Sequence, residues 1–281
     1  MNSMMLPKFP LGRSIEWLID FFVKHFSGFT NALSEIVESM IGLFTQLLNS
    51  SPPPLTIILF GILAWALTKR TGVTVFTVVG LFFVWNLRLW GVTMETISLV
   101  IVSTMVAIML GIPLGILAAL YRPFHHVITP ILDFMQTLPA FVYLIPAIPF
   151  FGLGVTSAVF STVIFAMPPA IRLTDLGIRQ VPGELVEAAD AFGSTKMQKL
   201  FKLQLPLAAV SIRAGVNQTI MLALSMVVIA SMIGAGGLGG VVWKAIQRLK
   251  PGMGFEAGIS IVILAIILDR MLQGQRKKKT A

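Results

Sequence analysis

The residues of this chain whose types and spacing could do chemistry gather in a polar segment, residues 172–206, between two apolar stretches. The segment predicts two short helices, the first beginning near Pro182 and ending at Gly193, where a left-handed backbone is favoured. Ser194 can cap the second helix, which must end before Pro206. One face of the first helix carries the apolar side chains Leu185, Ala188, Ala189 and Phe192. Such a face fits a groove on a partner protein, and a hairpin lying on the lipid surface is the alternative.

A second set of polar side chains lies near or within apolar stretches and could line a translocation pathway. The set comprises Asp133, Gln136, Thr137, Pro139, Asn217 and Gln218. A carboxylate inside a membrane marks a functional site by default, because exposure to lipid is costly. For Asp133 the favoured alternative is a structural bond to Arg122 or to a neighbouring helix. Asn217 and Gln218 could equally form hydrogen bonds between helices.

No residue pattern indicates catalysis. The chain has no cysteine, and its three histidines, His25, His125 and His126, stand in no arrangement typical of nucleophilic catalysis. Residues 234–239 match the dinucleotide-binding glycine pattern in letters only, because an apolar helix and not a strand precedes them, so they predict a glycine-rich turn. We therefore expect a chain that is not an enzyme and that binds no cofactor or metal.

The composition places these groups in a membrane protein. Charged residues make up 12% of the chain, against roughly 25% in soluble domains, and hydrophobic residues make up 56%. Residues 96–120, 134–171 and 214–242 carry no charge, and each stretch exceeds the ~20 residues that cross a hydrocarbon core. The fold class predicted is an all-α polytopic membrane protein.

Seven membrane spans are predicted, preceded by an amphipathic segment. The spans cover about residues 55–68, 71–87, 93–120, 129–151, 155–171, 207–233 and 255–271. Residues 1–54 predict two amphipathic helices that lie in the membrane interface or pack against the spans, and the prolines at 52–54 break the helix before the first span.

The distribution of basic residues predicts the orientation. The formal net charge is +9, and most Lys and Arg fall on the side of residues 172–206, which the positive-inside rule places in the cytoplasm. We therefore predict the N-terminus outside and the C-terminus inside. The basic excess indicates anchored loops and contact with membrane lipids, and it does not indicate nucleic-acid binding.

The segment 172–206 carries a spaced pattern made of Glu187, Ala188, Ala189, Gly193, Leu203, Gln204, Leu205 and Pro206. This pattern resembles the EAA loop found in permease subunits of binding-protein-dependent ABC importers. Leu203 stands where an isoleucine is usual. The resemblance implies a type I importer, MetI-like core in which this loop docks on a cytoplasmic ATPase.

Three longer stretches carry a more specific resemblance: DFMQTLPAFVYLIP (133–146), ALSMVVIASMIGAGGLG (223–239) and GFEAGISIVILAIILDR (254–270). They are similar to the glycine betaine and proline betaine permeases of osmoprotectant importers. The chain then divides into interfacial helices (1–54), two extra spans (55–91), the permease core with its coupling loop (92–271) and a basic cytoplasmic tail (272–281). Carnitine, choline, proline or a similar amino-acid-like solute is the alternative substrate.

The resemblance also implies the partners and the location. They are two copies of a cytoplasmic ATPase that holds ATP and Mg²⁺, a second copy of this chain and an extracellular or periplasmic substrate-binding protein. The implied location is the bacterial inner membrane. A secondary transporter, which would need coupling-ion sites of its own, and a membrane subunit without transport are the rival functions.

Overall fold

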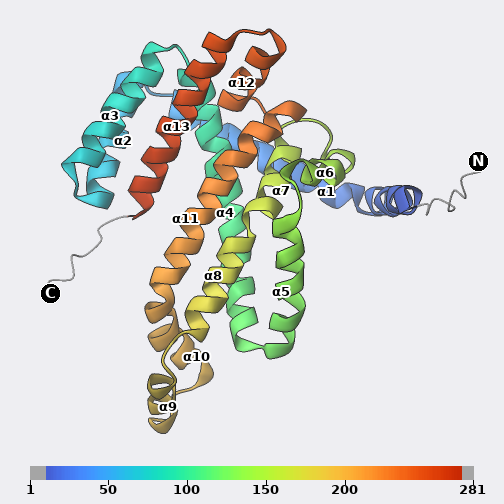
Figure 1. The fold of residues 1–281 in the computed structure, drawn as a ribbon, viewed down its shortest axis with the longest axis vertical. Helices are drawn as coiled ribbons and strands as arrows, with labels where there is room; N and C mark the ends of the chain where they lie inside the picture. The colour runs from blue at the N-terminus through green and yellow to red at the C-terminus, as the bar shows by residue number, and fades with distance from the viewer. Residues whose placement is uncertain (1–10, 274–281) are drawn as a thin grey trace, which may run out of the picture.

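The computed structural model describes residues 11–273, and the regular elements of that part of the chain are helices, which confirms the all-α prediction (Figure 1). The α-helices are α1 (Leu11–Asn49), α2 (Pro53–Thr68), α3 (Thr71–Asn86), α4 (Trp90–Leu120), α5 (Arg122–Thr137), α6 (Leu144–Phe151), α7 (Val155–Ala166), α8 (Pro168–Arg179), α9 (Gly183–Ala191), α10 (Lys196–Lys199), α11 (Leu205–Ala230), α12 (Gly237–Gln247) and α13 (Pro251–Gln273). Three short elements, η1 (Ala140–Tyr143), η2 (Leu200–Gln204) and η3 (Ser231–Ile233), join some of them. Most of the predicted basic tail lies outside the described residues.

Within the described residues, four helical segments are long and apolar enough to cross a membrane, and six are if two sharply bent helix pairs count as one span each. The four are Trp90–Leu120, Val155–Arg179, Lys196–Ile233 and Pro251–Leu272. The bounds of α2 and α3 agree closely with the first two predicted spans, although α3 is a shorter apolar helix. In Figure 1, α4, α8 and α11 run side by side along the long axis, and α2, α3 and α13 form one flank.

The N-terminal segment is one continuous helix of 39 residues, so the prediction of two helices was wrong. A mid-helix glycine such as Gly28 costs only about 1 kcal/mol, and the apolar positions continue beyond it. The second half of α1 packs against α4, α6 and α7, where Val37 is buried and Thr156 donates a 3.1 Å hydrogen bond to Glu38. The predicted break is present, because α2 starts at Pro53 after a bend of 103°.

The fourth predicted span is broken. Helices α5 and α6 meet at a bend of 112°, where Leu138 takes an extended conformation and Pro139 follows it. Proline disfavours a helical conformation in the residue before it and lacks an N–H of its own, which explains the break. The hydroxyl of Tyr143 donates to the carbonyl of Met135, and Ser161 donates to the carbonyl of Tyr143 at 3.1 Å. The first bond satisfies the carbonyl of Met135, whose helical partner would be the missing N–H of Pro139, and the second ties η1 to α7.

Helix α12 was missed, because its glycine-rich start predicted only a turn. Gly236 and Gly237 have φ of 76° and 64°, and α11 and not a strand precedes them. The amide of Gly237 donates to Glu95 at 3.0 Å and that of Leu238 donates to Thr96 at 2.8 Å. Side chains of α4 therefore cap the first turn of α12.

Glycines allow α4, α8 and α11 to approach closely. A Cβ on Gly111 would lie 2.8 Å from Ala170 Cβ, and one on Gly115 would lie 2.6 Å from both the carbonyl oxygen of Ile171 and Thr174 Cβ. Small residues four apart are the usual device by which membrane helices pack closely. The three-helix core that carries the polar segment therefore depends on these positions.

We expect Gly115→Ala to lower the stability of the protein by about 1–3 kcal/mol, the usual cost of overpacking. The added methyl group meets backbone at 2.6 Å, and the backbone cannot move aside as a flexible side chain would. The measurement is the thermal unfolding midpoint of the purified protein in detergent. Gly258→Ala is the matched control, because nothing lies within 4 Å of its added Cβ. Equal midpoints for the two variants would contradict the close packing of α4 on α8.

Candidate functional site

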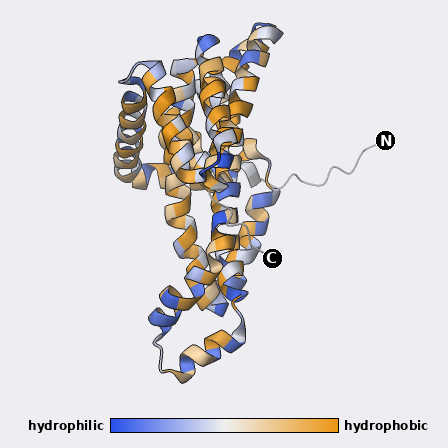
Figure 2. Ribbon diagram, turned by 90° about the vertical axis from the view of Figure 1, so that its left-hand side faces the viewer, coloured by the Kyte–Doolittle hydropathy of each residue, from blue (hydrophilic) through white to orange (hydrophobic). Residues whose placement is uncertain are grey.

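Helices α9 and α10 form a hairpin that projects from the end of the bundle. Figures 1 and 2 show it as the far tip of the molecule, beyond the mainly hydrophobic body. No residue of α9 is buried, and the exposed fractions of Leu185 and Phe192 are 44% and 92%. Met197 on α10 adds an apolar side chain that is 61% exposed. Solvent-exposed apolar side chains on a projecting tip are typical of a surface that binds another protein.

The corner between the two helices is a Schellman motif built on Gly193. Its φ is +73°, its amide donates to the carbonyl of Asp190 at 2.9 Å, and the amide of Ser194 donates to that of Ala189 at 3.0 Å. This pair of bonds defines the motif, and glycine adopts the left-handed conformation without steric cost. The predicted role of Gly193 in ending α9 is confirmed.

The second helix starts one residue later than predicted. Thr195, and not Ser194, caps α10: its hydroxyl accepts from the amide of Gln198 at 3.3 Å, and the Gln198 side chain accepts from the Thr195 amide at 2.9 Å. This reciprocal pair is a capping box. Lys199 then donates to both carboxylate oxygens of Asp190 at 2.7 Å, which ties α10 to α9.

The second helix does not end before Pro206, contrary to the prediction. A helical segment of 38 residues runs from Lys196 to Ile233. Its π-helical turn η2 lets the amide of Leu205 bond to the carbonyl of Leu200, so Pro206 enters at the first turn of α11, where no N–H is needed. Leu200 is buried against Ile178 and Ala208, with Leu205 beside them.

The residues predicted for the coupling loop therefore divide into two groups. Glu187, Ala188 and Gly193 are exposed on the projecting hairpin, and Ala189 is half-buried. Leu203 and Leu205 are half-buried, and Pro206 is exposed, at the root of the hairpin. The first group presents a surface, and the second fixes the hairpin to α11.

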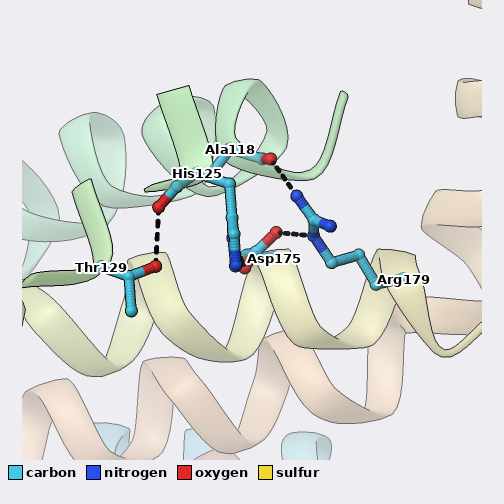
Figure 3. Close-up of polar contacts among 5 residues, drawn as sticks. All are labelled: Ala118, His125, Thr129, Asp175 and Arg179. Carbon is cyan, nitrogen blue, oxygen red and sulfur yellow. Dashed lines mark hydrogen bonds and ion pairs between the residues drawn. The ribbon is translucent and has the colours of Figure 1, made fainter. Parts of the chain in front are cut away.

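A cluster of charged residues, which sequence analysis missed, holds the helix that leads into the hairpin (Figure 3). Asp175 on α8 accepts from Arg179 at 2.7 Å, and Arg179 also donates to the carbonyl of Ala118 at the end of α4 at 2.7 Å. His125 on α5 places Nδ1 2.9 Å from the second oxygen of Asp175, at ion-pair distance but without hydrogen-bond alignment. The i, i+4 spacing of Asp175 and Arg179 was the signal available in the sequence.

The polar residues predicted for a pathway do not form one site within the chain. Asp133 is exposed and pairs with Arg172 of α8 at 2.5 Å, so the favoured alternative of a bond to a neighbouring helix fits the structure, with Arg172 in place of Arg122. Asn217 donates to Asp269 at 2.9 Å and joins α11 to α13. The remaining predicted residues, Gln136, Thr137, Pro139 and Gln218, are exposed.

Comparison with protein families gives a match that spans the region just described. Residues 111–279 match the model of the binding-protein-dependent transport system inner membrane component. The chain belongs to this family. It is therefore a multi-pass component of the inner membrane, and its hairpin lies inside the matched region.

Three relatives match this inner membrane component over nearly its whole length. It is 51% identical to the glycine betaine/carnitine transport permease protein GbuB of Listeria monocytogenes, over 97% of this chain and 98% of that protein. It is 48% identical to the glycine betaine transport system permease protein OpuAB of Bacillus subtilis, over 98% and 97%. It is 47% identical to the glycine betaine/proline betaine transport system permease protein ProW of Escherichia coli, over 94% and 74%.

A solved structure supports the fold. A chain of the inward-facing MetNI methionine ABC transporter superposes with a TM-score of 0.58 at 23% identity, covering 63% of this chain and 91% of that one. This likeness concerns the fold alone, and it confirms the predicted MetI-like core.

Proposed function

We propose that this chain is the transmembrane permease subunit of an ATP-driven, binding-protein-dependent importer of glycine betaine-type osmoprotectants. The observation that carries the proposal is identity of about half, over nearly the full chain, to permeases whose names give glycine betaine as a substrate. The predicted resemblance to osmoprotectant permeases points to the same substrate class. Carnitine, choline and proline are the competitors against which the substrate is tested.

The α9–α10 hairpin is proposed as the coupling element. Leu185, Phe192 and Met197 offer exposed apolar side chains to the groove of an ATPase, and Glu187, Ala188 and Gly193 belong to the same surface. Two ATPase copies, each with ATP and Mg²⁺, would bind two copies of this chain. Helix α10 continues into α11, and the charged cluster holds α8. Closure of the ATPases would therefore move whole helices, so that the substrate path opens in turn to the outside and to the inside of the cell.

The orientation proposed places the hairpin in the cytoplasm and the N-terminus outside. Residues 1–54 would lie in the interface, residues 55–91 would form a lipid-facing flank, and the permease core would extend from 92 to 271. A substrate-binding protein would dock at the end opposite the hairpin, near α12. The exposed polar residues Gln136, Thr137 and Gln218 would line the path between two copies.

The test is uptake of labelled glycine betaine by proteoliposomes that hold this chain with its ATPase, with the binding protein added outside. We expect uptake to require ATP and all three proteins, and an excess of unlabelled glycine betaine to block it. Competition by carnitine, choline and proline then ranks the substrates. Stimulated ATP hydrolysis without betaine uptake would contradict the substrate assignment and leave the coupling role intact.

A further inference from the structure

A basic cavity lies where the α2–α3 hairpin meets the end of α13. Its volume is about 610 Å³, and its wall carries three cations, Lys69, Arg70 and Arg270, and no acidic side chain. In the part of the chain that the structure describes, neither Arg70 nor Arg270 takes part in an ion pair. Three positive charges around one open cavity without a carboxylate create a strong preference for an anion.

The local backbone holds these cations at one place. Lys69 ends α2 in the left-handed conformation, with φ of 52°, and its ammonium group lies 4.1 Å from the ring centroid of Trp65. Arg70 is the residue before the first turn of α3, and Thr71 and Gly72 of that turn line the cavity. The positive end of the α3 dipole therefore adds to the three charges.

The cavity lies at one end of the apolar α2–α3 pair, from which lysine and arginine side chains can extend to the lipid headgroups. α2 and α3 have 16 residues each, so each is about 24 Å long and does not exceed the ~30 Å hydrocarbon core. Their outer faces are apolar, with Ile62 and Val75 about 60% exposed, as expected for contact with lipid. Figure 1 shows the α2–α3 turn and the end of α13 together on one flank of the molecule, far from the projecting tip that carries α9.

The walls of the cavity change from charged to apolar along the helices. Phe76 lies about one turn further into α3 than Thr71, and Ile266 lies one turn before Arg270 on α13. Both side chains line the cavity on the side of the bilayer interior. An amphiphile with an anionic head and an apolar tail matches this order.

We propose that Lys69, Arg70 and Arg270 bind the phosphate of an anionic phospholipid headgroup, with acyl chains along Phe76 and Ile266. Basic pockets between membrane helices are known to take such headgroups, and arginine matches the geometry of phosphate oxygens. The site goes beyond the proposed transport function, because it lies away from the coupling hairpin and from the exposed polar residues.

The test titrates short-chain phosphatidylglycerol into the full-length protein in neutral detergent and counts bound lipid by native mass spectrometry. Each neutralised arginine is expected to raise the Kd about fivefold, so Arg70→Gln with Arg270→Gln raises it about 25-fold. Arg88→Gln, which removes an exposed charge at the other end of the α2–α3 flank, is expected to bind like the unaltered protein. Circular dichroism confirms that each variant is folded.

Two results would overturn the proposal. One is a Kd for phosphatidylglycerol that is the same for the double variant as for Arg88→Gln. The other is binding of soluble glycerol phosphate as tight as that of the lipid, which would identify a site for a free phosphate ester. Phosphatidylcholine, whose headgroup carries no net charge, is expected to bind more weakly than phosphatidylglycerol and to lose little in the double variant.

Discussion

Replacing Gly193 by proline is expected to abolish betaine uptake while the protein still inserts in the membrane. Proline locks φ near −65°, whereas this position has φ of +73°, and proline also lacks the amide that bonds to Asp190. The corner between α9 and α10 cannot form with proline there. A Cβ placed on Gly193 would have nothing within 4 Å beyond its chain neighbours, so the added side-chain atoms do not disturb the helical bundle. We expect at least tenfold less uptake per ATP hydrolysed in proteoliposomes.

Two further variants distinguish the contribution of the turn at Gly193 from that of the exposed apolar surface. Gly193→Asn is expected to keep most activity, because asparagine tolerates the left-handed conformation. Phe192→Ser is expected to weaken co-purification of the ATPase without lowering the thermal midpoint, because this side chain is 92% exposed. Normal uptake by Gly193→Pro would refute the proposed coupling role of the hairpin.

Local signals in the sequence predicted most of the fold. The uncharged stretches located α4 and α11, the prolines at 52–54 located the bend before α2, and glycine at 193 located the end of α9. Each of these signals acts through the backbone of the residue itself or its immediate neighbours. These features could therefore be predicted without knowledge of the contacts between helices.

The predictions that were wrong depend on contacts distant in sequence or on compensation by the backbone. Proline at 206 was expected to end a helix, but the π-helical turn before it removes the clash and the lost bond. Proline at 139 was predicted to lie inside a span, but the chain bends there, and the Tyr143 hydroxyl, eight residues along the sequence, satisfies the freed carbonyl of Met135. The cluster around Asp175 depends on two other helices, since the carbonyl of Ala118 on α4 accepts from Arg179 and His125 on α5 lies against Asp175.

Replacing Asp175 by alanine is expected to be the most destabilising change among the charged residues described here. Its side chain is only 12% exposed, and its loss leaves Arg179 and His125 without their shared carboxylate. Breaking a buried ion pair costs about 3–5 kcal/mol, and the lower end applies because 32% of the Arg179 side chain is exposed. The measurement is the thermal unfolding midpoint in detergent, with ATP-dependent uptake as a second readout.

Asp133→Ala is the matched control, because this carboxylate also links α5 to α8, through Arg172 where Asp175 uses His125. Its side chain is 59% exposed and that of Arg172 is 41% exposed, so the pair contributes about 0–1 kcal/mol. The two variants remove the same chemical group between the same two helices, and they differ in burial and in the bond to the end of α4. A larger fall in both midpoint and uptake for Asp175→Ala would show that the cluster positions α8 ahead of the hairpin, and equal falls would refute it.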